Sequence, residues 1–148
     1  MRRKVFLHLI KNQSTKESGV LEVIDFLEVE IYYGCSKTLR RKILDGLKPR
    51  GWSSKVRLSH DSNISITAMN SRIALCLQTG NMGRFYSDLL KIQFLFTKNK
   101  IDSAIYVVPT KHLAQKMGSN LANFERFVEE LKLFQDVITV PMFVIGLI

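Results

Sequence analysis

Short apolar runs alternate with one long amphipathic segment in the middle of the chain, and this order constrains the fold more than any other feature. Residues 72–78 and 101–108 are apolar runs of strand length, rich in β-branched side chains. Residues 81–96, between them, carry apolar side chains at three- and four-residue spacing, which predicts an amphipathic helix. This order is typical of an α/β protein.

Shorter segments extend the pattern in both directions. Residues 54–58 and 63–69 are predicted strands that form an antiparallel β-meander with residues 72–78, and Asn70-Ser71 is the last turn of this meander. Beyond residue 108 the pattern predicts two helices, separated by Gly118-Ser119, and then an apolar final strand. These three segments span residues 110–117, 120–134 and 139–148.

The first fifty residues predict two helices preceded by a strand or arm. Residues 1–19 form the arm, with Ser18 as a possible cap of a helix over residues 20–33, which Gly34 ends. A strongly basic helix follows from Ser36 to about Leu44. The predicted order is α-α-β-β-β-α-β-α-α-β around a mixed central sheet, in a single domain of 148 residues.

Charge points to a polyanionic partner. Twenty-two Lys and Arg face thirteen Asp and Glu, for a formal net charge of +9, and nucleic acid is the first candidate. A solvated basic surface is the alternative. Trp52 offers a stacking surface within the basic stretch, and Arg84 suits a phosphate contact at the start of the long helix. The clustered candidates for contacts with DNA phosphates are Lys37, Arg40, Arg41, Lys42, Lys48, Arg50, Lys55 and Arg57.

The cysteine content and the hydropathy of the chain indicate the cellular compartment in which it is expected. Cys35 and Cys76 are too few and too far apart for a disulfide scaffold or a zinc site, which favours the cytoplasm. No stretch approaches the roughly 20 apolar residues that a membrane-spanning helix needs, so a membrane protein is not expected.

Several ordered blocks resemble one known family. Residues 72–81 (RIALCLQTGN) and 86–91 (YSDLLK) are similar to the active-site strand and following helix of the BglII/BstYI family of type II restriction endonucleases. Residues 105–111, 118–125 and 140–146 resemble that family's later strand, helix entry and closing strand. The resemblance implies the restriction-endonuclease fold, known as PD-(D/E)XK, with double-stranded DNA as partner and a two-fold dimer.

The resemblance also locates the family's catalytic positions in this chain. The family has an Asp, a Glu nine residues later and a Gln two residues beyond it, and its two carboxylates hold Mg²⁺, which activates water. Gln78 matches the Gln, but Cys76 and Thr67 stand at the Glu and Asp positions. A thiol and a neutral hydroxyl are poor ligands for Mg²⁺. We therefore predict no metal ligand, and we expect Mg²⁺ as a cofactor only if the protein is an active nuclease.

Two other chemistries are open. Relocated carboxylates are one, with Glu22, Asp25 and Asp61 as candidates, although Glu22 and Asp25 fit a solvated helix face and Asp61 fits a turn. A nucleophilic Cys76 is the other, but the sequence offers no recognisable base for it, which favours a small buried residue.

Three functions therefore compete. The first is a DNA-binding protein of a prokaryotic restriction or anti-phage defence system, with metal-dependent cleavage impaired or lost. The second is an active Mg²⁺-dependent endonuclease that uses the relocated acids. The third is a non-catalytic scaffold subunit of a larger complex, in which the positive charge has no DNA-binding role.

Overall fold

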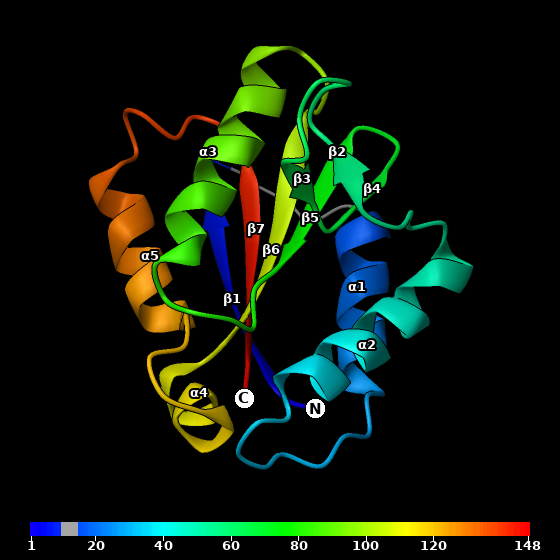
Figure 1. Ribbon diagram of the computed structural model, residues 1–148, viewed down its shortest axis with the longest axis vertical. Helices are drawn as coiled ribbons and strands as arrows, with labels where there is room; N and C mark the ends of the chain where they lie inside the picture. The colour runs from blue at the N-terminus through cyan, green and yellow to red at the C-terminus, as the bar shows by residue number, and fades with distance from the viewer. Residues whose placement is uncertain (10–14) are drawn as a thin grey trace.

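The computed structural model describes residues 1–9 and 15–148, and its centre is a five-stranded mixed sheet with helices on both faces (Figure 1). The strands lie in the order β1-β7-β6-β5-β4. β5, β6 and β7 are parallel, whereas β1 runs antiparallel to β7 and β4 antiparallel to β5. The bounds are β1 Arg3–His8, β4 Ala68–Asn70, β5 Ile73–Leu77, β6 Ser103–Pro109 and β7 Met142–Leu147.

Five α-helices surround the sheet in the described part of the chain. In Figure 1, α1 and α2 lie on one side of the strands and α3 and α5 on the other, with α4 near the end of the sheet where the chain terminates. The bounds are α1 Thr15–Asp25, α2 Ser36–Leu47, α3 Arg84–Thr97, α4 Lys111–Met117 and α5 Phe124–Leu133. A short 3-10 turn, η1, covers Lys48–Arg50 directly after α2.

Alternating side chains of the parallel strands fill two separate cores. Cys76 and Tyr106 pack with α3 and α5 in one core, whereas Leu77 and Val107 pack with α1, α2 and α4 in the other. Successive strand residues point to opposite faces, so a strand covered on both sides must be apolar throughout. This is why the uninterrupted apolar runs of the sequence identify these strands.

The predicted β-meander is divided into two sheets. β2 (Val56–Arg57) and β3 (Ser65–Ile66) form a separate antiparallel pair, and Thr67 separates β3 from β4. The two antiparallel pairings of the meander are present, one between β2 and β3 and one between β4 and β5. The predicted middle strand is broken at Thr67, so that β3 belongs to the small sheet and β4 to the central one. The prediction of one continuous strand over 63–69 is therefore wrong.

The first predicted helix is also wrong at both ends. α1 begins at Thr15, so Ser18 lies inside the helix and residues 15–19 are not part of an arm, while residues 10–14 lie outside the described part. After Asp25, residues 26–31 alternate between exposed and half-buried. A period of two belongs to extended backbone, and the half-buried members pack on the second core as loop residues. Gly34 lies in that loop, with φ of +93°, and does not end a helix.

The later elements agree with the prediction within a few residues. The mixed α/β sheet flanked by helices is confirmed, and β1 forms the strand expected near the N-terminus. The long central helix, predicted from residue 81, begins at Arg84, and the Asn81 side chain accepts a hydrogen bond from the Gly83 amide in the turn before it. No helix among the described residues is long and apolar enough to cross a membrane.

Candidate functional site

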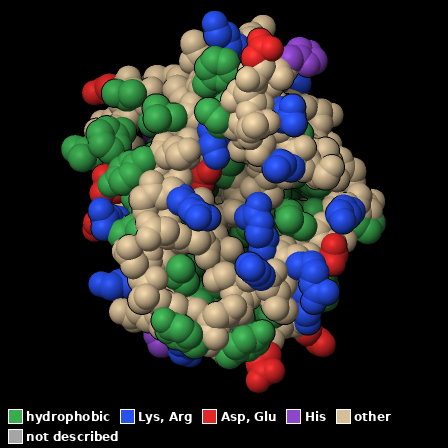
Figure 2. Space-filling model, in the orientation of Figure 1, with side chains coloured by type: hydrophobic (Ala, Val, Ile, Leu, Met, Phe, Trp, Pro, Cys, Tyr) green, Lys and Arg blue, Asp and Glu red, His purple; other side chains and the backbone are tan. Residues whose placement is uncertain are grey.

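A cleft of about 1020 Å³ opens between α2, the segment before β2, the strand β3, the end of β5 and the start of α3. Figure 2 shows Lys and Arg side chains gathered around a hollow in this face of the molecule. Among the described residues that line the cleft, seven are Lys or Arg and two are Asp. Asp45 pairs with Lys48 at 3.6 Å and Asp88 with Lys91 at 3.6 Å. The lining is therefore strongly positive, which suits a polyanion.

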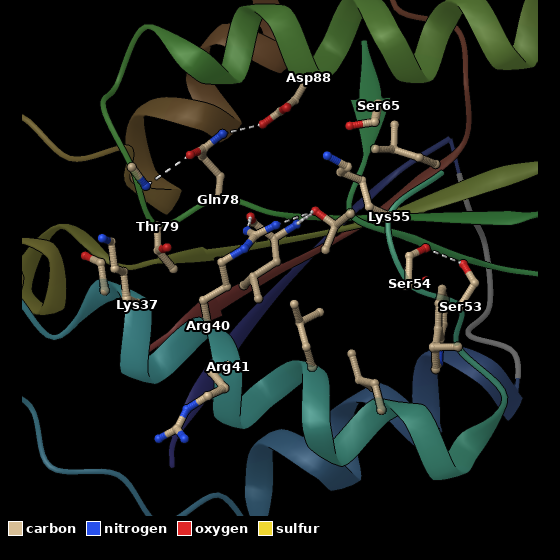
Figure 3. A pocket seen from close by; sticks show the side chains of 18 of the residues that line it. Lys37, Arg40, Arg41, Ser53, Ser54, Lys55, Ser65, Gln78, Thr79 and Asp88 are labelled. Carbon is tan, nitrogen blue, oxygen red and sulfur yellow. Dashed lines mark hydrogen bonds between the residues drawn. The ribbon is translucent and has the colours of Figure 1, made fainter. Parts of the chain in front are cut away.

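Arg40 reaches from α2 across the cleft to the sheet. Its Nη1 donates to the carbonyl oxygen of Leu77, and its Nη2 donates to Thr67 Oγ1 at 3.4 Å (Figure 3). Thr67 Oγ1 also accepts from the Leu77 amide at 3.1 Å. Burial lowers the pKa of Arg40, and the nearby Asp88 carboxylate opposes this change. Arginine stays protonated in proteins, so the group is a fixed cation.

A buried network centred on Asp88 forms the opposite wall. Gln78 Nε2 donates to Asp88 Oδ2 at 2.6 Å, and the Tyr106 hydroxyl donates to the same oxygen at 2.8 Å. Gln78 Oε1 accepts from the Gly80 amide at 3.0 Å, so the side chain is held at both ends (Figure 3). Burial, followed by the Asp88 charge, raises the pKa of Tyr106. Asp88 was not among the site residues predicted from the sequence, because its partners lie on β5 and β6.

Cys76 lacks the environment of a nucleophile. It is 2% exposed, and burial, followed by the charge of Asp88, raises the pKa of its thiol. The thiolate is the reactive form, so this setting disfavours reaction. His8 contacts the carbonyl oxygen of Ile138 at 2.8 Å through Nε2, and His60 and His112 are exposed side chains outside the cleft lining.

The candidate relocated acids lie elsewhere in the structure. Glu22 pairs with Arg50 at 2.9 Å, and Asp25 pairs with Arg3 at 2.8 Å. Asp61 is exposed in the turn between β2 and β3. None of the three is among the residues that line the cleft. The structure therefore does not bring these carboxylates to the positions of Thr67, Cys76 and Gln78.

The predicted basic residues divide into two groups. Three of them point to other partners: Lys42 Nζ donates to the Glu28 carbonyl at 2.7 Å, Arg50 pairs with Glu22, and Arg57 lines a separate small cavity. The other six line the cleft and are Lys37, Arg40, Arg41, Lys48, Lys55 and Arg84. Lys91 also lines the cleft. It was not predicted as a site residue, because its position in a helix does not reveal which part of the surface it faces.

Trp52 does not present a free stacking face. The side chain is 5% exposed and packs in the second core, although it contributes to the cleft wall. The predicted stacking role is therefore wrong for this conformation, because the indole is covered by protein.

A divalent metal does not fit the side chains at this site. Asp88 Oδ2 is occupied by Gln78 and Tyr106, and Oδ1 faces Lys91. The guanidinium of Arg40 lies against the Thr67 hydroxyl and the Leu77 carbonyl. In the described part of the chain, no cluster of three or more His, Cys, Asp or Glu side chains is arranged to hold a metal ion. Mg²⁺ needs oxygen ligands that are free to coordinate, and these are engaged.

The fold is the one seen in crystal structures of the restriction endonuclease BglII. A crystal structure of restriction endonuclease BglII complexed with a DNA 16-mer superimposes with a TM-score of 0.86 at 14% identity, covering 100% of this chain and 78% of that one. Free BglII superimposes with a TM-score of 0.79 at 12% identity, covering 100% and 80%.

A comparison of the amino-acid sequence with models of protein families identifies the family of this chain. The model of the restriction endonuclease BglII/BglIII family matches residues 10–147, so the chain belongs to this family. None of the curated proteins matches the chain. The predicted family resemblance and the restriction-endonuclease fold are therefore confirmed.

Proposed function

We propose that the protein binds double-stranded DNA in the basic cleft and does not cleave it by the metal-dependent chemistry of its family. The observation that carries the proposal is the excess of cationic side chains around a cleft that Thr67 lines. Thr67 and the buried Cys76 stand at the two carboxylate positions of the family, so neither supplies a metal ligand to this cleft. Lysine and arginine neutralise backbone phosphates and release counterions, which makes such binding independent of sequence and sensitive to salt. The DNA-complexed BglII structure supports DNA as the polyanion.

The direct test follows binding and cleavage together. Purified protein is titrated against supercoiled plasmid with Mg²⁺, with Mn²⁺ or with a chelator, and both retardation and nicking are read from one gel. We expect retardation in all three conditions and no cutting. Metal-dependent cutting would refute the loss of cleavage, and Glu22→Ala, Asp25→Ala and Asp61→Ala would then test the relocated acids. Neither retardation nor cutting would favour a scaffold subunit.

Charge-matched variants test whether the cleft is the binding surface. Arg84 lines the cleft and is exposed, whereas Lys132 is exposed on α5 and lies over the Phe6 ring at 5.3 Å. Each Gln substitution removes one positive charge. Arg84→Gln should weaken binding to a short duplex, while Lys132→Gln should leave it close to wild type. Equal losses would point to a diffuse charge effect and count against the cleft.

The biological setting that we propose is a prokaryotic restriction or anti-phage defence system in the cytoplasm, with the protein acting as a homodimer or as a subunit of a defence complex. Family membership supports this setting. A palindromic DNA site would require a two-fold dimer, because each half-site is read by one copy. Sedimentation of the protein with and without a duplex distinguishes one copy from two on the DNA.

A further inference from the structure

Arg40 lies next to the two strand segments that carry the positions of the family's missing metal ligands. Its guanidinium contacts Thr67, which stands at the Asp position, and the Leu77 carbonyl, which directly follows Cys76 at the Glu position. The charge of Arg40 also acts on the Cys76 thiol. A positive group therefore contacts the side chain at the Asp position and the backbone one residue after the Glu position.

The position of this guanidinium is fixed by the surrounding structure. Leu39 and Ile43, on either side of Arg40 in α2, are fully buried, which anchors the helix against the sheet. Thr67 Oγ1 accepts from both Arg40 and the Leu77 amide, so the hydroxyl ties β5 to the β3–β4 junction. In Figure 3, Arg40 points from α2 toward the strands, whereas Arg41 points away from them. Two adjacent arginines of one helix therefore have different environments.

We propose that the Arg40 guanidinium replaces the divalent cation of the family as the positive group that holds a backbone phosphate at this site. A guanidinium has five N–H donors, and the two contacts described above leave others for a ligand. Its planar fork matches two phosphate oxygens, and it needs no carboxylate ligands to stay in place. The identification of the phosphate as DNA rests on the proposed function, but the position of the cation does not.

The use of a guanidinium in place of a metal ion also explains why the side chains at positions 67 and 76 are neutral. If Asp and Glu stood at 67 and 76, they would form ion pairs with Arg40 and leave it less free to bind a phosphate. Thr67 instead accepts a hydrogen bond without adding charge, and Cys76 is a buried small side chain. The positive charge of the site then comes from a side chain of the protein instead of a bound metal ion.

The experiment restores the carboxylates with and without Arg40 and measures Mn²⁺ uptake by titration calorimetry in the absence of DNA. Wild type and Thr67→Asp/Cys76→Glu should take up no Mn²⁺ at millimolar concentration, because the guanidinium occupies the site in both. Adding Arg40→Gln to the double variant should create uptake of one ion per chain, at least roughly tenfold tighter than any residual binding. Equal uptake with and without Arg40, or no uptake by the triple variant, would overturn the proposal.

A second measurement avoids placing a charge at the buried Cys76. Thr67→Asp alone adds a carboxylate beside Arg40, so the thermal midpoint should rise in the wild-type background and fall in an Arg40→Gln background. An Arg41→Gln background is the matched control, where Thr67→Asp should again raise the midpoint. The same shift in all three backgrounds would overturn the assigned position of Arg40. Neither measurement contains DNA, so failure of DNA binding and failure of this proposal are separate results.

Discussion

Replacement of Asp88 by Ala should destabilise the protein more than loss of a typical polar side chain. Asp88 Oδ2 is the acceptor for both Gln78 Nε2, at 2.6 Å, and the Tyr106 hydroxyl, at 2.8 Å. Tyr106 is fully buried and Gln78 is 9% exposed, so water reaches the amide more readily than the hydroxyl. The variant therefore leaves one donor deeply buried and a second one partly so.

The magnitude follows from these two donors. A buried donor without an acceptor costs about 1–3 kcal/mol, and the partly accessible Gln78 falls at the low end. The ion pair with Lys91 spans 3.6 Å at a partly exposed position and contributes less than about 1 kcal/mol. Removal of a buried carboxylate returns some desolvation free energy. The expected loss is about 2–4 kcal/mol, or about 5–15 °C in the thermal midpoint for a chain of this length.

A double-mutant cycle measured by urea denaturation tests this reasoning. Tyr106→Phe alone should cost about 1 kcal/mol, because it removes a hydrogen bond to the carboxylate. In the Asp88→Ala background the same change should cost less than that or recover stability, since it removes the unpaired hydroxyl. A loss below about 0.5 kcal/mol for Asp88→Ala, or strictly additive effects, would show that the network does not stabilise the fold as described.

Three further predictions concern other features. If each cleft cation neutralises one phosphate, Arg84→Gln should reduce the slope of log K against log salt by about 0.9, and an unchanged slope in duplex titrations at several salt concentrations would exclude such a contact. Burial raises the pKa of the Cys76 thiol above its value in the unfolded chain. The thiol therefore contributes fully to the free energy of unfolding below a pH of about 8.5, and this contribution falls as the pH rises further. In urea denaturation at several pH values, the stability of Cys76→Ala should fall less steeply above that pH than the stability of the wild type. Gly146→Ala would place a Cβ 2.7 Å from the Phe124 ring and should cost about 1–3 kcal/mol, so a thermal midpoint equal to wild type would contradict the packing.

The sequence predicts the centre of the fold well for a physical reason. β5, β6 and β7 are covered on both faces, and their residues are almost all buried. A strand in this position must be apolar throughout, so a short apolar run bounded by turn residues is a strong signal. The N-terminal part has no such signal, because the apolar residues after Asp25 fit a helical count although they belong to an extended loop.

The site is less predictable than the sheet, because its contacts join distant parts of the chain. Gln78 and Thr67 are recognisable through the family pattern, but Arg40 is 27 residues before Thr67 and was one of several clustered basic residues. Only the packing of α2 decides that Arg40 enters the cleft while Arg50 pairs with Glu22 on the surface. Asp88 was also hidden, since its helix position alone does not reveal the donors on β5 and β6.

The side chains at positions 40, 67 and 76 constrain one another electrostatically. A guanidinium between two carboxylates would be held in ion pairs, whereas the same guanidinium beside Thr67 and Cys76 keeps N–H groups for an external anion. Restoring either carboxylate while Arg40 remains should therefore reduce the affinity for a phosphate instead of recovering metal chemistry. In the proposed site, the neutral side chains at 67 and 76 and the positive charge of Arg40 therefore depend on one another, because a phosphate can use the guanidinium only while no carboxylate competes for it.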